Sequence, residues 1–191
     1  MKQVILVTGT PGTGKTTISR LISIKLNAGH IDLTTYAQAN HLTISRDKFR
    51  ETDVIDLNAV RRSITEEIKK ALGSIVIDGH YASDVTKIEL VTRIFVLRRE
   101  PWLLFEELMK RNYSKLKIKE NVEAELLGVC LNDTAFKQDP KKICEIDTSH
   151  QNPEETTSRI ISVLSGVKSC GFGKIDWMDR SETEELVKEL I

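Results

Sequence analysis

Short runs of apolar, mostly β-branched residues alternate along the chain with longer stretches in which apolar residues recur every three or four positions. The short runs are typical of buried parallel strands, and the longer stretches are typical of amphipathic helices. Such alternation predicts an α/β fold, a three-layer sandwich in which helices cover both faces of a parallel sheet. The expected strands lie at 4–8, 30–33, 74–78, 94–97 and 142–146.

The first strand runs directly into a glycine-rich segment. Residues 9–16, Gly-Thr-Pro-Gly-Thr-Gly-Lys-Thr, fit the pattern G-x-x-x-x-G-K-[ST], and a helix is expected to follow. Backbone N–H groups of such a loop wrap a polyphosphate, and the helix points its positive end at the same charge. Lys15 is then expected to act on the β and γ phosphates, and Thr16 to hold Mg²⁺. The residues expected to bind ATP here are Gly12, Thr13, Gly14, Lys15, Thr16 and Thr17.

An acidic residue ends the expected strand at 74–78. Asp78 has the position of a Walker B acid, which holds Mg²⁺ through water; the alternative is a helix N-cap. His80 follows two residues later and is a candidate catalytic group near the γ-phosphate or an attacking water. The alternative for His80 is a structural histidine.

Several arginines are candidates for binding phosphate, because a guanidinium matches phosphate oxygens bidentately. Arg111 is a catalytic and ATP-binding candidate, and Arg98 an acceptor-binding one, whereas Arg99 is interpreted as a surface charge. Arg46 and Arg50 lie in a polar stretch and are candidates for the acceptor's phosphate. For each of them the alternative is a solvated surface charge, and the basic run 110–119 faces ATP, RNA or water.

Two segments depart from the strand–helix pattern. Residues from about 31 to 54 predict an inserted flap with a short helix, and those from about 111 to 121 a short lid. The core is expected to span 1–166. Glycines interrupt the chain after that point, and 167–191 is interpreted as an extension that ends in a short helix docked on the core.

Composition narrows the class of protein. A length of 191 residues predicts one domain with a sizeable core, and 28 basic residues balance 28 acidic ones, so no global attraction to nucleic acid or membrane is expected. Cys130, Cys144 and Cys170 are odd in number and far apart, which predicts reduced thiols rather than a metal site. Without an apolar run of about 18 residues or a signal peptide, we expect a cytoplasmic monomer.

Five motifs occur together in one order. They are residues 9–17, Asp78-Gly79-His80, Val96-Leu97-Arg98, Arg111-Asn112-Tyr113 and Asn152-Pro153-Glu154-Glu155. This set resembles the adenylate kinase isoenzyme 6 family, small archaeal and eukaryotic nucleotide kinases tied to small ribosomal subunit assembly. The resemblance covers roughly residues 1–166.

The resemblance implies a P-loop kinase fold with a nucleoside-monophosphate flap and a short lid. It implies transfer of a phosphoryl group from MgATP to AMP, giving two ADP, with ATPase activity beside it. A small-subunit protein of the uS11 type and pre-ribosomal RNA are the implied partners. By the same resemblance Asp78 and His80 form the Walker B pair, Arg111 is the lid arginine, and Asn152 lies near the adenine.

The flap departs from the family pattern at one position. The family usually has an arginine early in the flap helix, where this chain has Gln38, so Arg46 or Arg50 would have to substitute. The identity of the acceptor therefore stays open. Two alternatives remain: an assembly ATPase with incidental kinase activity, and a kinase for another nucleotide or small acceptor.

Overall fold

A five-stranded parallel sheet forms the centre of the structure, a computed structural model that describes residues 2–48 and 52–190. Each neighbouring pair of strands in this sheet is parallel, which confirms the predicted α/β class. The strand order is β2 (Gly29–Asp32), β5 (Ile75–Asp78), β1 (Val4–Gly9), β6 (Arg93–Arg98) and β7 (Ile143–Asp147). All five predicted strands are present, with no end shifted by more than one residue.

Both faces of the sheet are buried, as the apolar runs predict. Side chains of β1 alternate between two hydrophobic clusters, with Leu6 in one and Ile5 and Val7 in the other. None of the three side chains is exposed to solvent. Complete burial of an apolar side chain of this size contributes about 1.5–3 kcal/mol to the free energy of folding. The loop that follows β1 therefore starts from a stable strand at the centre of the sheet.

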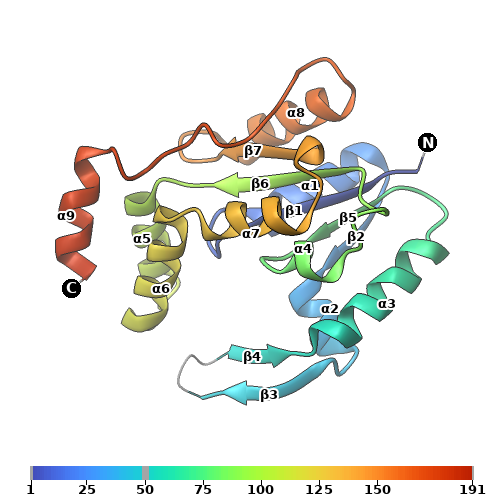
Figure 1. The fold of residues 1–191 in the computed structure, drawn as a ribbon, viewed down its shortest axis with the longest axis horizontal. Coiled ribbons are helices and arrows are strands. Elements are labelled where there is room, and N and C mark those ends of the chain that lie inside the picture. The colour runs from blue at the N-terminus through green and yellow to red at the C-terminus, as the bar shows by residue number, and fades with distance from the viewer. Residues whose placement is uncertain (1, 49–51, 191) are drawn as a thin grey trace.

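Helices cover the sheet on both sides and complete three layers (Figure 1). The side chains that fill the two clusters come from different helices. One face packs against α1 (Lys15–Leu26) and α8 (Pro153–Leu164), and the other against α3 (Leu57–Lys70), α4 (Ala82–Val85) and α7 (Val129–Lys137). Asp56 caps α3, because its carboxylate accepts a hydrogen bond from the Ala59 N–H. This arrangement is the predicted three-layer sandwich.

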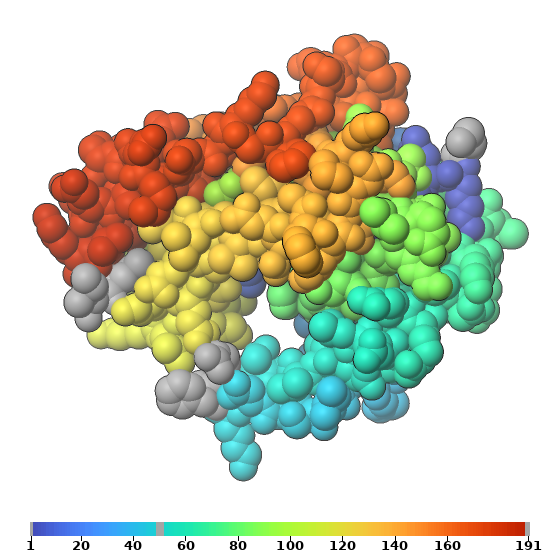
Figure 2. All heavy atoms as spheres, viewed as in Figure 1, coloured from blue at the N-terminus to red at the C-terminus, as the bar shows by residue number. Residues whose placement is uncertain are grey.

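Between β2 and α3 the chain leaves the sheet. A short helix, α2 (Leu33–Ala39), agrees with the predicted one, and an antiparallel hairpin of β3 (Thr43–Asp47) and β4 (Thr52–Ile55) follows it. The sequence did not predict the hairpin, because four of the five residues of β3 are exposed and no buried face marks the strand. Figure 2 shows a hollow between this flap and the segment around residues 110–125.

The other wall of the hollow belongs to α5 (Pro101–Lys110) and α6 (Lys115–Leu126). α5 begins at Pro101, a residue suited to the first helical turn, and α6 begins after Ser114, whose side chain caps it. Gly128 has φ 63°, a left-handed conformation that ends α6 and separates it from α7.

The end of the chain packs along the core rather than leaving it. A single turn, η1 (Pro140–Lys142), leads into β7, and after α8 the chain runs back beside β7 to α9 (Ser181–Leu190). Leu186 of α9 joins a hydrophobic cluster with α5 and α6, and the Trp177 side chain is buried. Within residues 2–48 and 52–190 we find no helix whose length and apolar character would let it cross a membrane.

Two of the three cysteines are joined, which corrects the prediction of reduced thiols. Cys144 of β7 and Cys170 form a disulfide whose Cα atoms are 5.3 Å apart, while Cys130 is free. A separation of 26 residues gives no spacing signal in the sequence. The return of the chain along β7 brings the pair together, and the bond fixes the start of the C-terminal segment to the sheet.

Candidate active site

The glycine-rich loop connects the carboxyl end of β1 to α1. Gly9 has φ 136°, and a Cβ atom there would lie 2.3 Å from the carbonyl oxygen of Leu97. Gly12 has φ 98°, and a Cβ atom there would lie 2.6 Å from the Leu104 side chain. These glycines are therefore required by the neighbouring strand and helix as well as by any ligand. The loop is wedged between β6 and α5.

Lys15 is the first residue of α1, and its side chain bends back across the loop. Its Nζ donates hydrogen bonds to the carbonyl oxygens of Gly9 and Thr10, at 2.8 Å and 2.9 Å. Burial lowers the pKa of Lys15 below its usual value, while the negative charges of Asp78 and Glu125 oppose that effect. The amine is thus held at the mouth of the loop, where a phosphate oxygen would replace the carbonyl groups as its partner.

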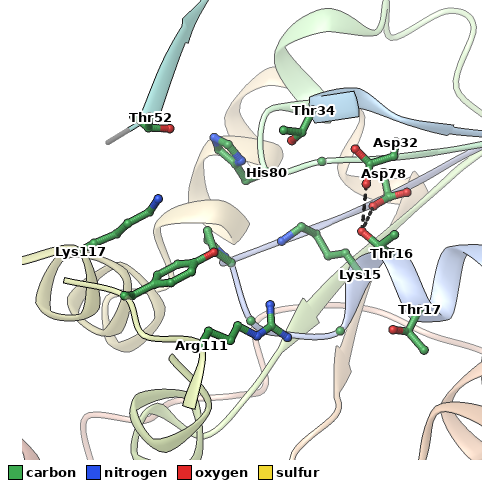
Figure 3. A pocket seen from close by; sticks show the side chains of 15 residues that line it. Lys15, Thr16, Thr17, Asp32, Thr34, Thr52, Asp78, His80, Arg111 and Lys117 are labelled. Carbon is green, nitrogen blue, oxygen red and sulfur yellow. Dashed lines mark hydrogen bonds between the residues drawn. The ribbon is translucent and has the colours of Figure 1, made fainter. Parts of the chain in front are cut away.

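Oxygen atoms gather at the carboxyl ends of β2 and β5. The Thr16 hydroxyl lies 2.9 Å from Oδ2 of Asp78 and 3.2 Å from Oδ2 of Asp32, as Figure 3 shows. His30 fixes the other oxygen of Asp78, with 2.5 Å between Nε2 and Oδ1. Asp78 thus faces the loop, as expected of a Walker B acid, and not a helix N-terminus. A hydroxyl with two carboxylates is the type of donor set that suits a hard cation.

His80 lies across the pocket from the loop, and part of its ring is exposed toward the pocket. Surrounding protein atoms keep water from the rest of the ring, and this lowers the pKa of His80 to about 4. The positive charge of Lys15 acts in the same direction. The imidazole is therefore neutral near pH 7, and it stacks edge-on against Tyr81 with 5.0 Å between ring centroids.

The lid contributes two cations and an aromatic ring to the same space. Arg111 lies beside Lys15, and the Lys117 side chain points toward Thr52 and His80 (Figure 3). An ion pair with Glu107, 2.8 Å from Nη2, holds the Arg111 guanidinium, and Lys117 lies 4.6 Å above the Tyr113 ring. The cavity that these residues enclose with the loop measures about 440 Å³. Its positive lining is appropriate for a polyphosphate.

A second cavity, of about 220 Å³, opens beneath the flap. Arg46 lines it, and Gln38 donates a hydrogen bond of 2.9 Å to the Asp53 carboxylate across it. Both cavities are lined by Thr34, Thr52 and His80, so they adjoin each other at these three residues. Arg50, the other acceptor candidate of the flap, lies outside the described residues.

Arg98 does not reach either cavity, which corrects its prediction as an acceptor-binding residue. Its side chain is 3% exposed, and its guanidinium donates to Glu125 and Glu145 at 2.6 Å each. The carbonyl oxygen of Glu125 accepts a third hydrogen bond from it, at 2.9 Å. Each of the three guanidinium nitrogens thus donates to a buried oxygen, and the group is not available to a phosphate in either cavity.

Other predicted residues fall outside the cavity. Thr13 is buried, and its hydroxyl donates to the Thr10 carbonyl oxygen, while Asn152 caps α8 in a reciprocal pair with Glu155. Gly12, Gly14, Lys15, Thr16 and Thr17 line the cavity, and their binding of ATP stays a prediction.

Sequence reasoning missed several residues of the site. Asp32 was detectable in the same way as Asp78, because each is an acid near the carboxyl end of a strand. Lys117 belongs to the basic run 110–119, and the sequence does not show which of those side chains faces the cavity. The residues not singled out from the sequence are His30, Asp32, Thr34, Thr52 and Lys117.

Comparison with known proteins places this site in a family. A family model described as an AAA domain matches residues 5–128. Proteins named "Putative adenylate kinase" match nearly the whole chain. The one from Saccharolobus islandicus (strain Y.G.57.14 / Yellowstone #1) is 35% identical over 98% of this chain and 94% of its own length. The one from Methanococcus maripaludis (strain C7 / ATCC BAA-1331) is 36% identical over 92% of this chain and 96% of its own.

Solved structures agree on the fold. Shikimate kinase from Acinetobacter baumannii is similar with a TM-score of 0.62 at 15% identity, over 88% of this chain and 96% of that one. Shikimate kinase from Bacteroides thetaiotaomicron is similar with a TM-score of 0.54 at 18% identity, over 85% of this chain and 98% of that one. At such identities the likeness concerns the fold alone. The family model covers the P-loop and both walls of the cavity, and the relatives align along nearly the full length of the chain. The chain therefore belongs to the AAA-domain family of P-loop kinases.

Proposed function

We propose that the chain is a nucleotide kinase that transfers the γ-phosphoryl group of ATP to AMP and gives two ADP. The observation that carries the proposal is that the two cavities adjoin and share Thr34, Thr52 and His80 in their walls. One cavity has the phosphate-binding loop, and the other lies under the flap. Nucleotides bound in both would present their phosphates to each other. The names of the relatives support the same reaction.

Transfer of this kind requires alignment and charge neutralisation more than covalent chemistry. In the proposal Lys15 leaves the carbonyl oxygens of Gly9 and Thr10 for the β and γ phosphates. Arg111 and Lys117 neutralise the γ-phosphoryl group from the lid side, and Arg46 binds the phosphate of the acceptor. Closure of the flap and lid over the hollow then excludes water from the reaction.

The residues of the site fit Mg²⁺, which in the proposal accompanies ATP. The Thr16 hydroxyl would hold the ion directly and Asp78 would hold it through water, beside Asp32. Among residues 2–48 and 52–190 no group of three or more His, Cys, Asp or Glu side chains forms a metal site of its own. This agrees with an ion held largely by phosphates and water. When bound, Mg²⁺ supplies positive charge against the β and γ phosphates.

One observation favours ATP hydrolysis as a second activity. A neutral His80 at the junction of the cavities is able to accept a hydrogen bond from water and so orient it toward a γ-phosphate. The family resemblance joins such ATPase activity to assembly of the small ribosomal subunit, with a uS11-type protein and pre-ribosomal RNA as partners. In this alternative the kinase activity is incidental.

A comparison of acceptors tests the proposal. ADP formation is measured with MgATP alone, with MgATP and AMP, and with MgATP and CMP, GMP, UMP or shikimate, each with Lys15→Met as the inactive control. Formation of two ADP per ATP, dependent on AMP, is the expected result. Equal ADP formation with and without every acceptor would instead identify an ATPase. Faster transfer to an acceptor other than AMP would overturn the assignment of AMP.

A further inference from the structure

A buried carboxylate connects the phosphate-binding loop to the C-terminal segment. Glu125 of α6 is 1% exposed. Its Oε2 accepts a hydrogen bond from the Thr10 hydroxyl at 2.6 Å. Its Oε1 accepts three hydrogen bonds, from Nε of Arg98 at 2.6 Å, from the indole N–H of Trp177 at 3.1 Å and from the backbone N–H of Arg99 at 3.2 Å. Residues from four distant parts of the chain therefore meet at one carboxylate.

Trp177 is held firmly in this position. Its side chain is 1% exposed, the Arg98 guanidinium lies 5.7 Å from the ring centre, and Trp102 packs edge-on at 6.2 Å. The preceding residues are fixed as well, because Glu145 accepts hydrogen bonds from the backbone N–H groups of Gly173 and Lys174 at 2.9 Å and 3.1 Å. The indole N–H thus has a buried partner and little freedom to leave it.

The loop residue at the other end of this connection is central to phosphate binding. The backbone carbonyl oxygen of Thr10 accepts hydrogen bonds from Nζ of Lys15 and from the Thr13 hydroxyl, each at 2.9 Å. Glu125 fixes the side chain of the same residue. The orientation of Glu125 consequently controls the backbone against which Lys15 is set.

We propose that Trp177 is a positioning residue for ATP. Its indole N–H holds the Glu125 carboxylate in the orientation that anchors Thr10, and Thr10 in turn shapes the loop that Lys15 crosses. Trp177 lies outside residues 5–128, the part matched by the family model, so the C-terminal segment supports a nucleotide site whose ligands lie elsewhere. The inference rests on the proposed function only in taking ATP as the ligand of the loop.

The first test is Trp177→Phe, which keeps an aromatic ring and removes the N–H donor. We expect the Kd for ATP, measured by calorimetry without an acceptor, to rise about fivefold to tenfold. This is less than the full effect of one hydrogen bond to a charged group, because the loss reaches ATP only through Glu125 and Thr10. The KM for the acceptor should stay within about twofold, because the flap cavity has no contact with this network. Trp102→Phe is the matched control. It alters the same ring pair but leaves the donor, and its Kd for ATP should stay at the wild-type value.

A double-mutant cycle tests the route. Thr10→Val removes the hydroxyl that Glu125 anchors, so it should weaken ATP binding. If Trp177 acts through Glu125 and Thr10, adding Trp177→Phe to Thr10→Val should cause little further loss. Additive losses would contradict the route.

A third measurement does not depend on the folding of Trp177→Phe. The chain has two tryptophans, so Trp102→Phe leaves Trp177 as the single tryptophan, whose emission is excited selectively over that of the three tyrosines. Saturating ATP should change its emission. An unchanged emission, or a Kd for ATP in folded Trp177→Phe equal to that of wild type, would overturn the inference. ATP binding without any phosphoryl transfer to AMP would instead refute the proposed function and leave the role of Trp177 intact.

Discussion

Replacement of Arg98 should destabilise the fold severely, although sequence reasoning placed this residue at the acceptor. The side chains of Arg98, Glu125 and Glu145 are 3%, 1% and 2% exposed. Arg98→Met keeps much of the apolar stem and removes the charge, which leaves two carboxylates buried without their shared cation. Breaking a buried ion pair in this way typically costs about 3–5 kcal/mol.

The expected loss is large compared with the stability of an ordinary domain, about 5–15 kcal/mol. For a chain of this size each kcal/mol shifts Tm by about 2–4 °C, so Arg98→Met should lower Tm by about 6–20 °C. The free energy of unfolding is measured by urea titration followed by tryptophan fluorescence, and Tm by calorimetry.

The neighbouring residue provides a matched control. The Nε atom of Arg99 is buried and has no hydrogen-bond partner within residues 2–48 and 52–190. Arg99→Met should therefore change the free energy of unfolding by less than about 1 kcal/mol. If Arg98→Met unfolded like wild type and raised the KM of the acceptor instead, the burial argument would be refuted and the original prediction restored.

Three further results are expected. Lys15→Met should reduce ATP turnover by about 10²-fold or more with an unchanged Tm, because the side chain contributes charge rather than packing; normal turnover would exclude the loop as the phosphate site. His80→Asn should reduce ATP hydrolysis by about 10²-fold and AMP phosphorylation by less, since AMP brings its own nucleophile; equal losses would indicate general disruption. A two-headed ATP–AMP mimic should protect residues 34–48 and 111–121 from hydrogen exchange, and protection of the P-loop alone would argue against an acceptor site under the flap.

The pKa of His80 supplies a fifth prediction. The pKa is about 4 in the folded chain, below the ordinary histidine pKa of 6.5. Between pH 4 and pH 6.5 the imidazole therefore binds a proton in the unfolded chain but not in the folded one. The contribution of His80 to stability is therefore complete above pH 6.5 and is lost as pH falls toward 4. NMR titration should show a neutral ring down to about pH 4. In Lys15→Met the pKa should be higher, because the Lys15 charge is one cause of the shift; an unchanged value would exclude that interaction.

The sequence predicted the parts of the site that are local in the chain. Strand, loop and helix follow one another within the first 26 residues, and backbone geometry alone directs Gly12, Gly14, Lys15 and Thr16 into one cavity. Asp78 was predictable for a related reason, since the carboxyl ends of parallel strands share one edge. These residues needed no information about distant partners.

Arg98 shows where such reasoning stops. An arginine at the carboxyl end of a strand is equally suited to a phosphate and to a carboxylate. In this structure the Arg98 guanidinium binds the carboxylates of Glu125 and Glu145, which lie 27 and 47 positions further along the chain. Trp177 and the Cys144–Cys170 disulfide depend in the same way on the return of the chain along β7. A pattern of neighbouring residues does not predict that the C-terminal segment runs back along β7.

In the flap, the sequence departs from the pattern of the resembling family at one residue, and the structure shows what that residue does. Gln38 stands where the resembling family usually has an arginine, and in the structure its amide is paired with Asp53 inside the flap cavity. A neutral amide satisfied by a carboxylate gives an acceptor phosphate no positive charge. Among the described flap residues that line this cavity, Arg46 is the cation. In the proposed kinase, recognition of the acceptor phosphate would therefore depend on Arg46 of β3 rather than on α2. Arg46 lines the flap cavity and not the cavity of the phosphate-binding loop, so Arg46→Met should raise the KM of the acceptor without changing the Kd for ATP, and an unchanged KM would contradict this role.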